Sequence, residues 1–144
     1  MFWFDRNQQG VLFADKRRES HILCDGRVLN ITPQIQIDFR NMPFRDNSFK
    51  LIVFDPPHLH NLGGSSWMAK KYGRLNNTWQ TDITQGFNES MRCLELYGIL
   101  IFKWNERDIP ATKIIKIVNT APLFGHITGK QTIWMTFMKK EKEK

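Results

Sequence analysis

A strand-like apolar run over residues 51–54 stops at the tetrapeptide Asp55-Pro56-Pro57-His58. Proline has a fixed φ and no amide proton, so two successive prolines make a rigid corner whose carbonyl oxygens stay available as acceptors. Because open α/β sheets bind ligands beyond the carboxyl ends of their strands, we expect this corner to face a ligand. The groups in the corner are suited to holding an amine.

The corner offers two acceptors to one donor group. The Asp55 carboxylate and the Pro56 carbonyl match an exocyclic NH2, which has two protons to donate. The ring of His58 could stack on the base that carries the amine. Preorganised acceptors of this kind favour the amine as it gains positive charge while attacking a methyl sulfonium. A strand-ending turn with an N-capping acid is the alternative, and the tetrapeptide alone leaves both open.

Length and composition indicate one globular domain. The chain has 144 residues, of which 41% are hydrophobic and 12% aromatic, and this composition argues against disorder. We expect a single domain over residues 1–138, with an atypical N-terminal strand and hairpin over 1–34, and a solvated charged tail over 139–144. No apolar run approaches the roughly 18 residues that a membrane span needs.

The cysteines and the N-terminus predict a cytoplasmic protein. Cys24 and Cys93 are far apart and lack C-x-x-C spacing, which favours two free thiols in a reducing compartment. The chain does not open with a basic segment followed by an apolar one, so no secretory signal is expected. The four histidines and two cysteines fit no standard ligand spacing, and we expect no metal site.

The basic charge suits a polyanionic partner. Lysine and arginine outnumber aspartate and glutamate by 21 to 14, a formal net charge of +7, although charge alone is weak evidence for nucleic acid. The segment 63–77 interleaves aromatic and basic side chains that could contact bases and phosphates. These candidates are Trp67, Lys70, Lys71, Tyr72 and Arg74. The alternative is a surface loop whose aromatic residues anchor it to the core.

Apolar and alternating runs predict the strands. Single strands are expected at 11–15, 35–39, 49–54 and 99–104. Two hairpins are expected, one around Asp25-Gly26 and one within 122–138.

Two helices are expected between these strands. The first should begin at Asn77 or Thr78 and end at Gly98. Its apolar residues then share one face, and they are Trp79, Ile83, Phe87, Met91 and Leu94. The second helix should follow Pro110. Strand, helix, strand, helix and a terminal hairpin describe a three-layer α/β sheet with an antiparallel edge.

The tetrapeptide Asp55-Pro56-Pro57-His58 resembles the D-P-P-Y/F/W motif of amino-group methyltransferases, the class I enzymes that use S-adenosylmethionine on adenine or cytosine amines. Small phage and prophage proteins of this class carry the D-P-P-H form. The preceding residues 38–57, "DFRNMPFRDNSFKLIVFDPP", are similar to the passage from the third to the fourth strand of such enzymes. Later segments are similar as well, so the resemblance covers about residues 35–138.

The resemblance implies a fold and an activity. The expected fold class is α/β, a reduced Rossmann-like class I methyltransferase fold with a mostly parallel sheet and an antiparallel C-terminal edge. The expected function is methyl transfer from S-adenosylmethionine to an exocyclic base amine, with adenine favoured, in nucleic acid, and in DNA rather than RNA. A chain this small has little surface for target recognition, which leaves a homodimer or a partner subunit open.

The resemblance also assigns site residues. The four corner residues would be catalytic, and Asp55 would also contact the cofactor. Asp38, followed by Phe39, corresponds to the acid near the cofactor's adenine. Asp15, which ends the apolar run 11–15, would replace the acid that holds the ribose.

Two further residues lie just past a strand end, on the same rim as Asp55. Asn105 would line the amine pocket. Lys103 could line it as well, but a solvated position is favoured for this lysine.

Two departures from the family support a rival interpretation. The glycine-rich first motif F-x-G-x-G, which holds the methionine part of the cofactor, is absent, and the chain has no G-x-G. The fourth corner residue is His58, whose imidazole can stack, form hydrogen bonds or carry charge near neutral pH. The rival is a non-catalytic nucleic-acid-binding or partner-binding protein on a degenerate methyltransferase fold.

Overall fold

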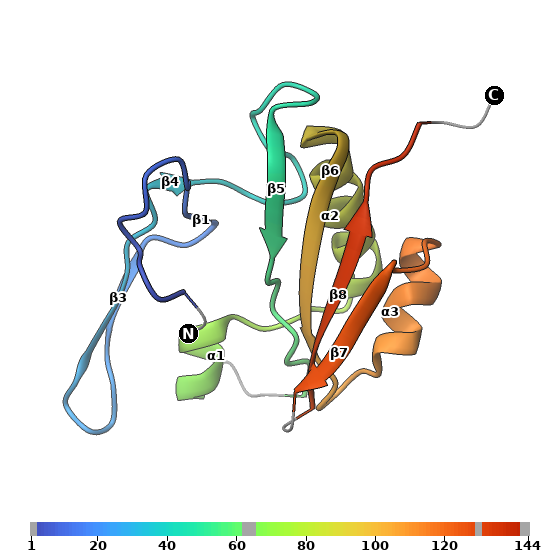
Figure 1. Ribbon diagram of the computed structural model, residues 1–144. Helices are drawn as coiled ribbons and strands as arrows, with labels where there is room; N and C mark the ends of the chain where they lie inside the picture. The colour runs from blue at the N-terminus through green and yellow to red at the C-terminus, as the bar shows by residue number, and fades with distance from the viewer. Residues whose placement is uncertain (1–2, 62–65, 129–130, 142–144) are drawn as a thin grey trace.

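The computed structural model describes residues 3–61, 66–128 and 131–141 (Figure 1). The helices are α1 (Trp67–Tyr72), α2 (Trp79–Cys93) and α3 (Ala111–Val118). The strands are β1 (Ala14–Asp15), β2 (Glu19–Ile22), β3 (Val28–Ile31), β4 (Ile35–Gln36), β5 (Phe49–Phe54), β6 (Leu94–Asn105), β7 (Phe124–Thr128) and β8 (Thr132–Met138). Among these residues no helix has the length and apolar content of a membrane-crossing segment.

A four-stranded sheet with the order β5-β6-β8-β7 forms the centre of the molecule. Strands β5 and β6 are parallel, and the connection between them runs through α2. Strand β8 lies between β6 and β7 and is antiparallel to both. The remaining strands form two separate pairs, β1 with β4 and β2 with β3.

The expected Rossmann-like, mostly parallel sheet is wrong. Within the described residues β5–β6 is the one parallel pair of the central sheet, because the C-terminal hairpin supplies the other two strands. The segments 11–15 and 35–39, both expected as strands, pair only over Ala14–Asp15 and Ile35–Gln36. The chain therefore has a small mixed sheet with antiparallel pairing in the majority.

Aspartates turn the chain where the short strands β1 and β4 end. The Asp15 carboxylate accepts the backbone amide of Arg17 at 2.8 Å, and Asp38 accepts that of Arg40 at 3.0 Å. Aspartate side chains that bond the backbone two residues on are typical of turns. Each turn diverts the chain after a short strand, so neither segment extends the central sheet.

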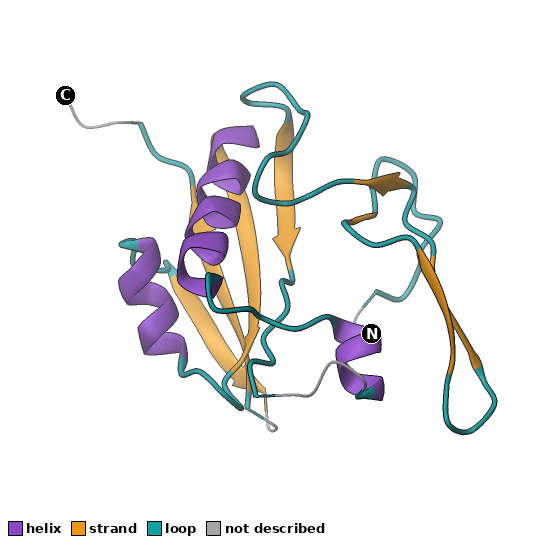
Figure 2. Cartoon of the chain, turned by 180° about the vertical axis from the view of Figure 1, so that it is seen from behind, coloured by secondary structure: helices purple, strands orange, loops and turns teal. Residues whose placement is uncertain are grey.

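Helices α2 and α3 lie on the same face of the central sheet, which makes two layers where three were expected (Figure 2). Strand side chains alternate between faces, and in β6 Leu100, Phe102 and Trp104 point toward the helices and are fully buried. Residues of α2 and α3, including Ile83 and Ile114, complete this core. The opposite face of the sheet carries no helix from the described residues.

The apolar stripe of α2 is confirmed, but the helix ends earlier than expected. Trp79, Ile83 and Phe87 are buried along it. The helix stops at Cys93, and Leu94 has the extended backbone of the first residue of β6. The expected end at Gly98 is therefore wrong. The second helix follows Pro110 as expected.

Lys139 fastens the C-terminal end of α2. Its ammonium donates to the carbonyl oxygens of Arg92 and Leu94, at 3.1 and 2.7 Å, and to the Asn47 side-chain oxygen at 2.8 Å. Lysine side chains near a helix C-terminus satisfy carbonyls that the helix leaves without partners. Lys139 is the first residue of the segment expected to form a charged tail, and here it holds the helix to the sheet.

The hairpin around Asp25-Gly26 is confirmed. Strands β2 and β3 pair in antiparallel register, with Gly26 at φ +78 in the turn. The hairpin extends away from the body of the molecule (Figure 1). Ile22 and Val28 face each other near its tip and are both exposed.

Gly86 of α2 lets two aromatic rings approach the helix. A Cβ at this position would lie 2.5 Å from Phe39 Cδ2 and 2.7 Å from Phe54 Cζ. The rings of Phe39 and Phe54 pack edge to face, with centroids 5.2 Å apart. The connection from β4 to β5 is thus packed against α2 through a position that has no side chain.

We expect Gly86→Ala to destabilise the fold, although alanine is the better helix former. The added methyl group would force both rings to move, and overpacking of this type costs about 1–3 kcal/mol, which exceeds a helix-propensity gain of up to about 1 kcal/mol. Urea denaturation measures the difference. Asn88→Ala, at an exposed position of the same helix, is the control. A Gly86→Ala variant more stable than wild type would contradict the close packing.

Candidate functional site

Asp55 directly follows β5 and forms an ion pair with the neighbouring strand. The parallel register pairs Phe54 with Phe102, so Asp55 lies beside Lys103 of β6. The Lys103 ammonium contacts both carboxylate oxygens, at 3.0 and 2.9 Å. The Asp55 side chain is still 37% exposed. The carboxylate is therefore accessible, but a cation already neutralises its charge.

The two prolines give the corner its shape. Pro56 is buried, and among the described residues no donor forms a hydrogen bond with its carbonyl oxygen. Pro57 packs against Gly73, where a Cβ would lie 3.1 Å from Pro57 Cγ and the backbone has φ +74. Glycine is favoured at this φ. The segment after α1 can thus approach the corner closely.

His58 packs into the corner between β6 and α1. Its ring centroid lies 6.4 Å from that of Trp104 and 6.3 Å from that of Tyr72. Burial lowers the pKa of His58, and the nearby Asp55 carboxylate opposes this shift only in part. The ring is therefore neutral near neutral pH. It connects the corner to Tyr72, one of the aromatic residues expected to contact a base.

Asp108 holds the loop that follows His58. One of its carboxylate oxygens accepts the backbone amides of His60 and Asn61, at 2.8 and 3.0 Å. Two charge-assisted hydrogen bonds to adjacent amides fix the path of a loop that has no regular structure. The connection between β6 and α3 thus supports the corner from the other side.

Asp15, expected to hold the cofactor ribose, is engaged by Arg17. The Arg17 guanidinium donates to Asp15 Oδ1 at 3.1 Å and to Oδ2 at 3.0 Å. The same guanidinium donates to the carbonyl oxygen of Lys70 in α1 at 2.9 Å. Arg17 also lies near Gly73, which packs on the corner. Asp15 is therefore connected to the segment beside the corner through Arg17.

Asp38, expected near the cofactor's adenine, lies in a network of charges. Arg40 donates to both of its oxygens, at 3.0 and 2.6 Å, and Lys16 lies 3.0 Å from one of them. Arg40 also reaches Asp82 of α2 at 3.0 Å. The Arg40 guanidinium holds the pKa of Asp38 well below its ordinary range, against the effect of burial.

Phe39, the remaining expected cofactor residue, is half-buried against Phe54.

These placements decide how well the chain could hold S-adenosylmethionine. Asp15, Asp38 and Asp55 are each partly exposed, at 33%, 27% and 37% of the side chain. Carboxylates in this state can accept hydrogen bonds from hydroxyl and amine groups. The donor set fits the cofactor to this extent, although the Phe39 ring packs against Phe54 and the core.

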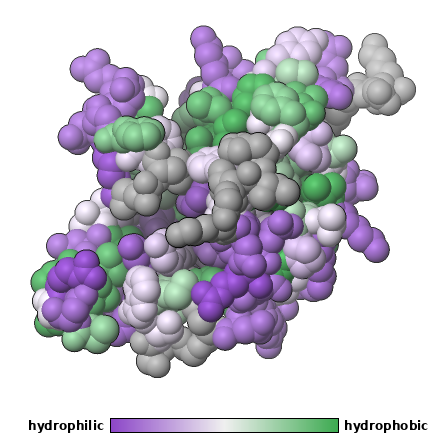
Figure 3. Space-filling view, turned by 60° about the horizontal axis from the view of Figure 1, so that its bottom comes forward, coloured by the Kyte–Doolittle hydropathy of each residue, from purple (hydrophilic) through white to green (hydrophobic). Residues whose placement is uncertain are grey.

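Helix α1 presents aromatic and basic side chains beside the corner. Trp67 is 49% exposed and Tyr72 is 42% exposed. The Lys71 ammonium lies 5.8 Å from the first ring and 5.2 Å from the second. Figure 3, which brings this end of the molecule forward, shows hydrophilic residues over much of the surface. The arrangement is typical of surfaces that contact nucleic acid.

The other residues of the expected loop 63–77 are placed as follows. Residues 63–65 lie outside the described residues, and 67–72 form α1 where a loop was expected. Lys70 is half-buried and gives its carbonyl oxygen to Arg17. Arg74 is exposed just beyond the helix.

Asn105 lies at the end of β6, two residues beyond Lys103. Its amide donates to Thr132 of β8 at 3.0 Å, and its side-chain oxygen accepts the Arg107 amide at 3.0 Å. These bonds turn the chain at the end of the strand. The side chain shares a face with Lys103 but is occupied with the β6–β8 end of the sheet.

The segment "MPFRDNSF", which carried part of the resemblance, has a structural explanation. Arg92 at the end of α2 donates to the carbonyl oxygens of Met42 and Phe44, at 3.0 and 2.8 Å, and to Asp46 at 2.7 Å. Glu89 accepts the amide of Met42 at 2.9 Å. These bonds fasten the loop to the C-terminal end of α2, whereas the corner lies at the opposite end of β5.

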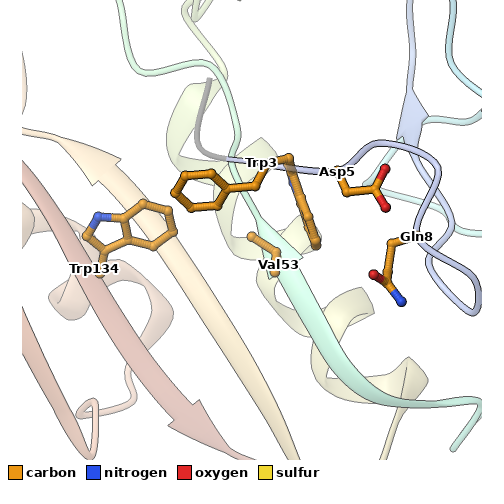
Figure 4. Close-up of a pocket in the computed structure, with 6 residues that line it drawn as sticks. Trp3, Asp5, Gln8, Val53 and Trp134 are labelled. Carbon is orange, nitrogen blue, oxygen red and sulfur yellow. The ribbon is translucent and has the colours of Figure 1, made fainter.

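A hollow lies on the helix-free face of the sheet, next to the corner (Figure 4). Its volume is about 410 Å³, and its lining consists of Trp3, Phe4, Asp5, Gln8, Val53 and Trp134. Val53 is two residues before Asp55 on the same strand, and Trp134 is the register partner of Lys103. No sequence pattern predicted the hollow, because its walls come from the N-terminus, β5 and β8.

Sequence reasoning missed three residues that shape the corner. Lys103 was assigned to solvent, although its position past a strand end on the rim of Asp55 was a usable signal. Trp104 packs on His58, and Asp108 holds the following loop. Both are long-range contacts that no spacing in the sequence reveals.

Neither metal ligands nor known relatives point to a function. Among the side chains that the structure describes, no three histidine, cysteine or acidic residues gather as a metal site. No protein-family model matches the chain, and no curated protein matches its sequence. The D-P-P resemblance thus stays a hypothesis based on local residues.

We expect the free energy of unfolding to fall as the pH drops from about 7 to about 5, and His58→Gln to remove part of this dependence. The folded protein lowers the pKa of His58 below its ordinary value of about 6.5. At pH values between the lowered pKa of the folded protein and the ordinary pKa, the unfolded chain binds a proton at His58 that the folded chain does not. The free energy of unfolding is therefore undiminished above the ordinary pKa and decreases as the pH falls below it.

Denaturation curves at several pH values test this expectation. His21→Gln is the control, because the His21 side chain bonds Glu19 of the same exposed hairpin and no other residue that the structure describes. Equal pH dependence in wild type and His58→Gln would show that the corner does not favour neutral imidazole.

Proposed function

We propose that the chain transfers a methyl group from S-adenosylmethionine to an exocyclic amine of a base in nucleic acid, with adenine as the favoured base and DNA as the favoured polymer. The observation that supports this proposal best is the corner itself. An accessible carboxylate directly follows a strand, beside a proline carbonyl that no described residue contacts by hydrogen bond.

Each corner residue has a role in this proposal. The Asp55 carboxylate and the Pro56 carbonyl accept the two protons of the amine and orient its lone pair for attack. Both acceptors gain strength as positive charge develops on the nitrogen. Pro57 fixes the direction of the two acceptors, because neither proline can rotate about φ. When bound, S-adenosylmethionine supplies a methyl group on a positively charged sulfur.

Lys103 and His58 support the acceptors. Lys103 contacts both oxygens of Asp55, so it can release one to the amine while it keeps the other. Neutral His58 packs between Trp104 and Tyr72 and thereby separates the corner from α1. The proton that the methylated nitrogen loses passes to water at the exposed side of Asp55.

The surface of α1 would hold the polymer. Its two exposed aromatic rings can stack on bases, and Lys70, Lys71 and Arg74 can neutralise phosphates. Tyr72 contributes both to this surface and to the contact with His58. A base that stacks here would carry its amine toward the corner.

One observation favours the rival, a nucleic-acid-binding protein without catalysis. All three carboxylates assigned to cofactor or amine are already paired with cations in the molecule, Asp15 with Arg17, Asp38 with Arg40 and Asp55 with Lys103. Ion pairs of this kind also serve structure alone. If the chain is a binding protein without catalysis, α1 and the basic charge serve to bind nucleic acid.

We expect Asp55→Asn to reduce methyl transfer by about 10²- to 10³-fold, the usual effect of removing one preorganised electrostatic contact. The stability should change by less than about 1 kcal/mol, because the pair with Lys103 is partly exposed. The measurement is transfer of labelled methyl from S-adenosylmethionine to adenine-containing oligonucleotides. Asp25→Asn in the exposed hairpin is the matched control. Undiminished transfer in Asp55→Asn would refute the role of the carboxylate.

Calorimetry separates the proposed enzyme from the rival. An enzyme should bind S-adenosylmethionine, and the heat should diminish in Asp55→Asn. The rival should give no heat with cofactor up to about millimolar concentration and should still bind oligonucleotides in a salt-sensitive manner.

A further inference from the structure

The hollow beside the corner is lined by side chains from the N-terminal segment and from the sheet. Trp3 and Phe4 come from the N-terminal segment, while Val53 of β5 and Trp134 of β8 belong to the sheet. In Figure 4, Val53 lies beneath the aromatic side chains, and Trp134 lies across from Trp3. Three aromatic side chains thus surround one aliphatic side chain from the sheet.

The N-terminal wall is held in place although it lies at the surface. Trp3 packs edge to face against Phe13, with ring centroids 5.0 Å apart. Asp5 accepts the amide of Asn7 at 2.8 Å, which turns the chain just after the wall. Phe4, in contrast, is wholly exposed. An aromatic side chain in this state has most of its surface available to a ligand.

We propose that this hollow binds an aminopurine ring. Flat aromatic ligands gain most from stacking on tryptophan and phenylalanine. The volume of about 410 Å³ lies within the range of small-molecule sites. The carboxylate of Asp5 and the amide of Gln8 lie on the side away from Trp134 (Figure 4), where they can bond the amine and ring nitrogens of a purine.

The hollow lies beside the ion pair of Lys103 with Asp55. Lys103 is the register partner of Trp134 and binds Asp55, so a lysine and the corner lie at one edge of the hollow. The net charge of +7 favours phosphates in addition. Both a base of nucleic acid and the adenosyl part of a cofactor provide an aminopurine ring, and the nucleic acid also carries phosphates. The inference rests on the proposed function only because that function names these two sources of the purine.

Titration with two probes tests the inference. One probe is S-adenosylhomocysteine, and the other is a short single-stranded oligothymidylate that contains one adenine, with the all-thymine strand as reference. Affinity is measured by calorimetry, and the indole NH signals are followed by NMR. Binding of S-adenosylhomocysteine in the hollow would identify the cofactor as the source, and preference for the adenine strand alone would identify the target base. Either result supports the site.

Two variants locate the binding. Phe4→Ala and Trp134→Leu should each weaken purine binding by about tenfold, the usual scale of a lost base–aromatic contact. Phe4→Ala carries little risk of misfolding because Phe4 is wholly exposed. Phe124→Leu, an exposed aromatic residue of β7 outside the hollow, should stay within about twofold of wild type. Wild-type purine affinity in Phe4→Ala would overturn the inference, and so would the absence of S-adenosylhomocysteine binding at millimolar concentration together with equal binding of the two strands.

The failure of this inference can be told from the failure of the proposed function. Binding in the hollow requires no methyl transfer, so the Phe4→Ala comparison depends on purine affinity alone. If purines bind in a Phe4-dependent manner but no amine is methylated, the proposed purine site is supported and the proposed methyltransferase activity is refuted. If methyl transfer occurs and Phe4→Ala leaves purine affinity unchanged, only the proposed purine site is refuted.

Discussion

The alternation of side chains along β6 connects the core to the site. Leu100, Phe102 and Trp104 point into the helix layer and are fully buried, whereas Lys103 points to the other face and binds Asp55. A shift of this strand by one residue would bury the lysine and expose the tryptophan, which the hydrophobic core does not permit. The position of the ion pair therefore follows from core packing. Trp104 adds a second connection, because it supports His58 from within.

Charge pairing gives the site its electrostatic character. Asp15, Asp38 and Asp55, the three acids predicted for the site, are each paired with a cation, so oppositely charged groups lie side by side. This matters for a protein with a net charge of +7, because unpaired carboxylates would repel phosphates. Paired carboxylates keep their acceptor oxygens without repelling a polyanion. The same pairs attach the N-terminal third of the chain to α1 and α2, through Arg17 and Arg40.

Local signals in the sequence predicted several elements after residue 48 well. The strand 49–54, the buried stripe of α2 and the helix after Pro110 are found where apolar periodicity places them, because each buries its own apolar face. The sheet as a whole was not predicted. Runs 11–15 and 35–39 look like strands, but aspartate turns shorten them, and no local pattern shows that they pair only with each other. Lys103, Asp108 and the hollow depend on contacts between distant segments, which spacing does not encode.

The clamp formed by Lys139 has a practical consequence for anyone who produces this protein. A gene fragment that stops at Met138 would encode every strand and helix that the structure describes, yet it would lack the ammonium that joins the last turn of α2 to Asn47. Purification tags are therefore better fused beyond Lys140, with a spacer that leaves this lysine in place. Lys139 thus belongs to the folded unit through its side chain and through its backbone bonds with Tyr97 and Gly98.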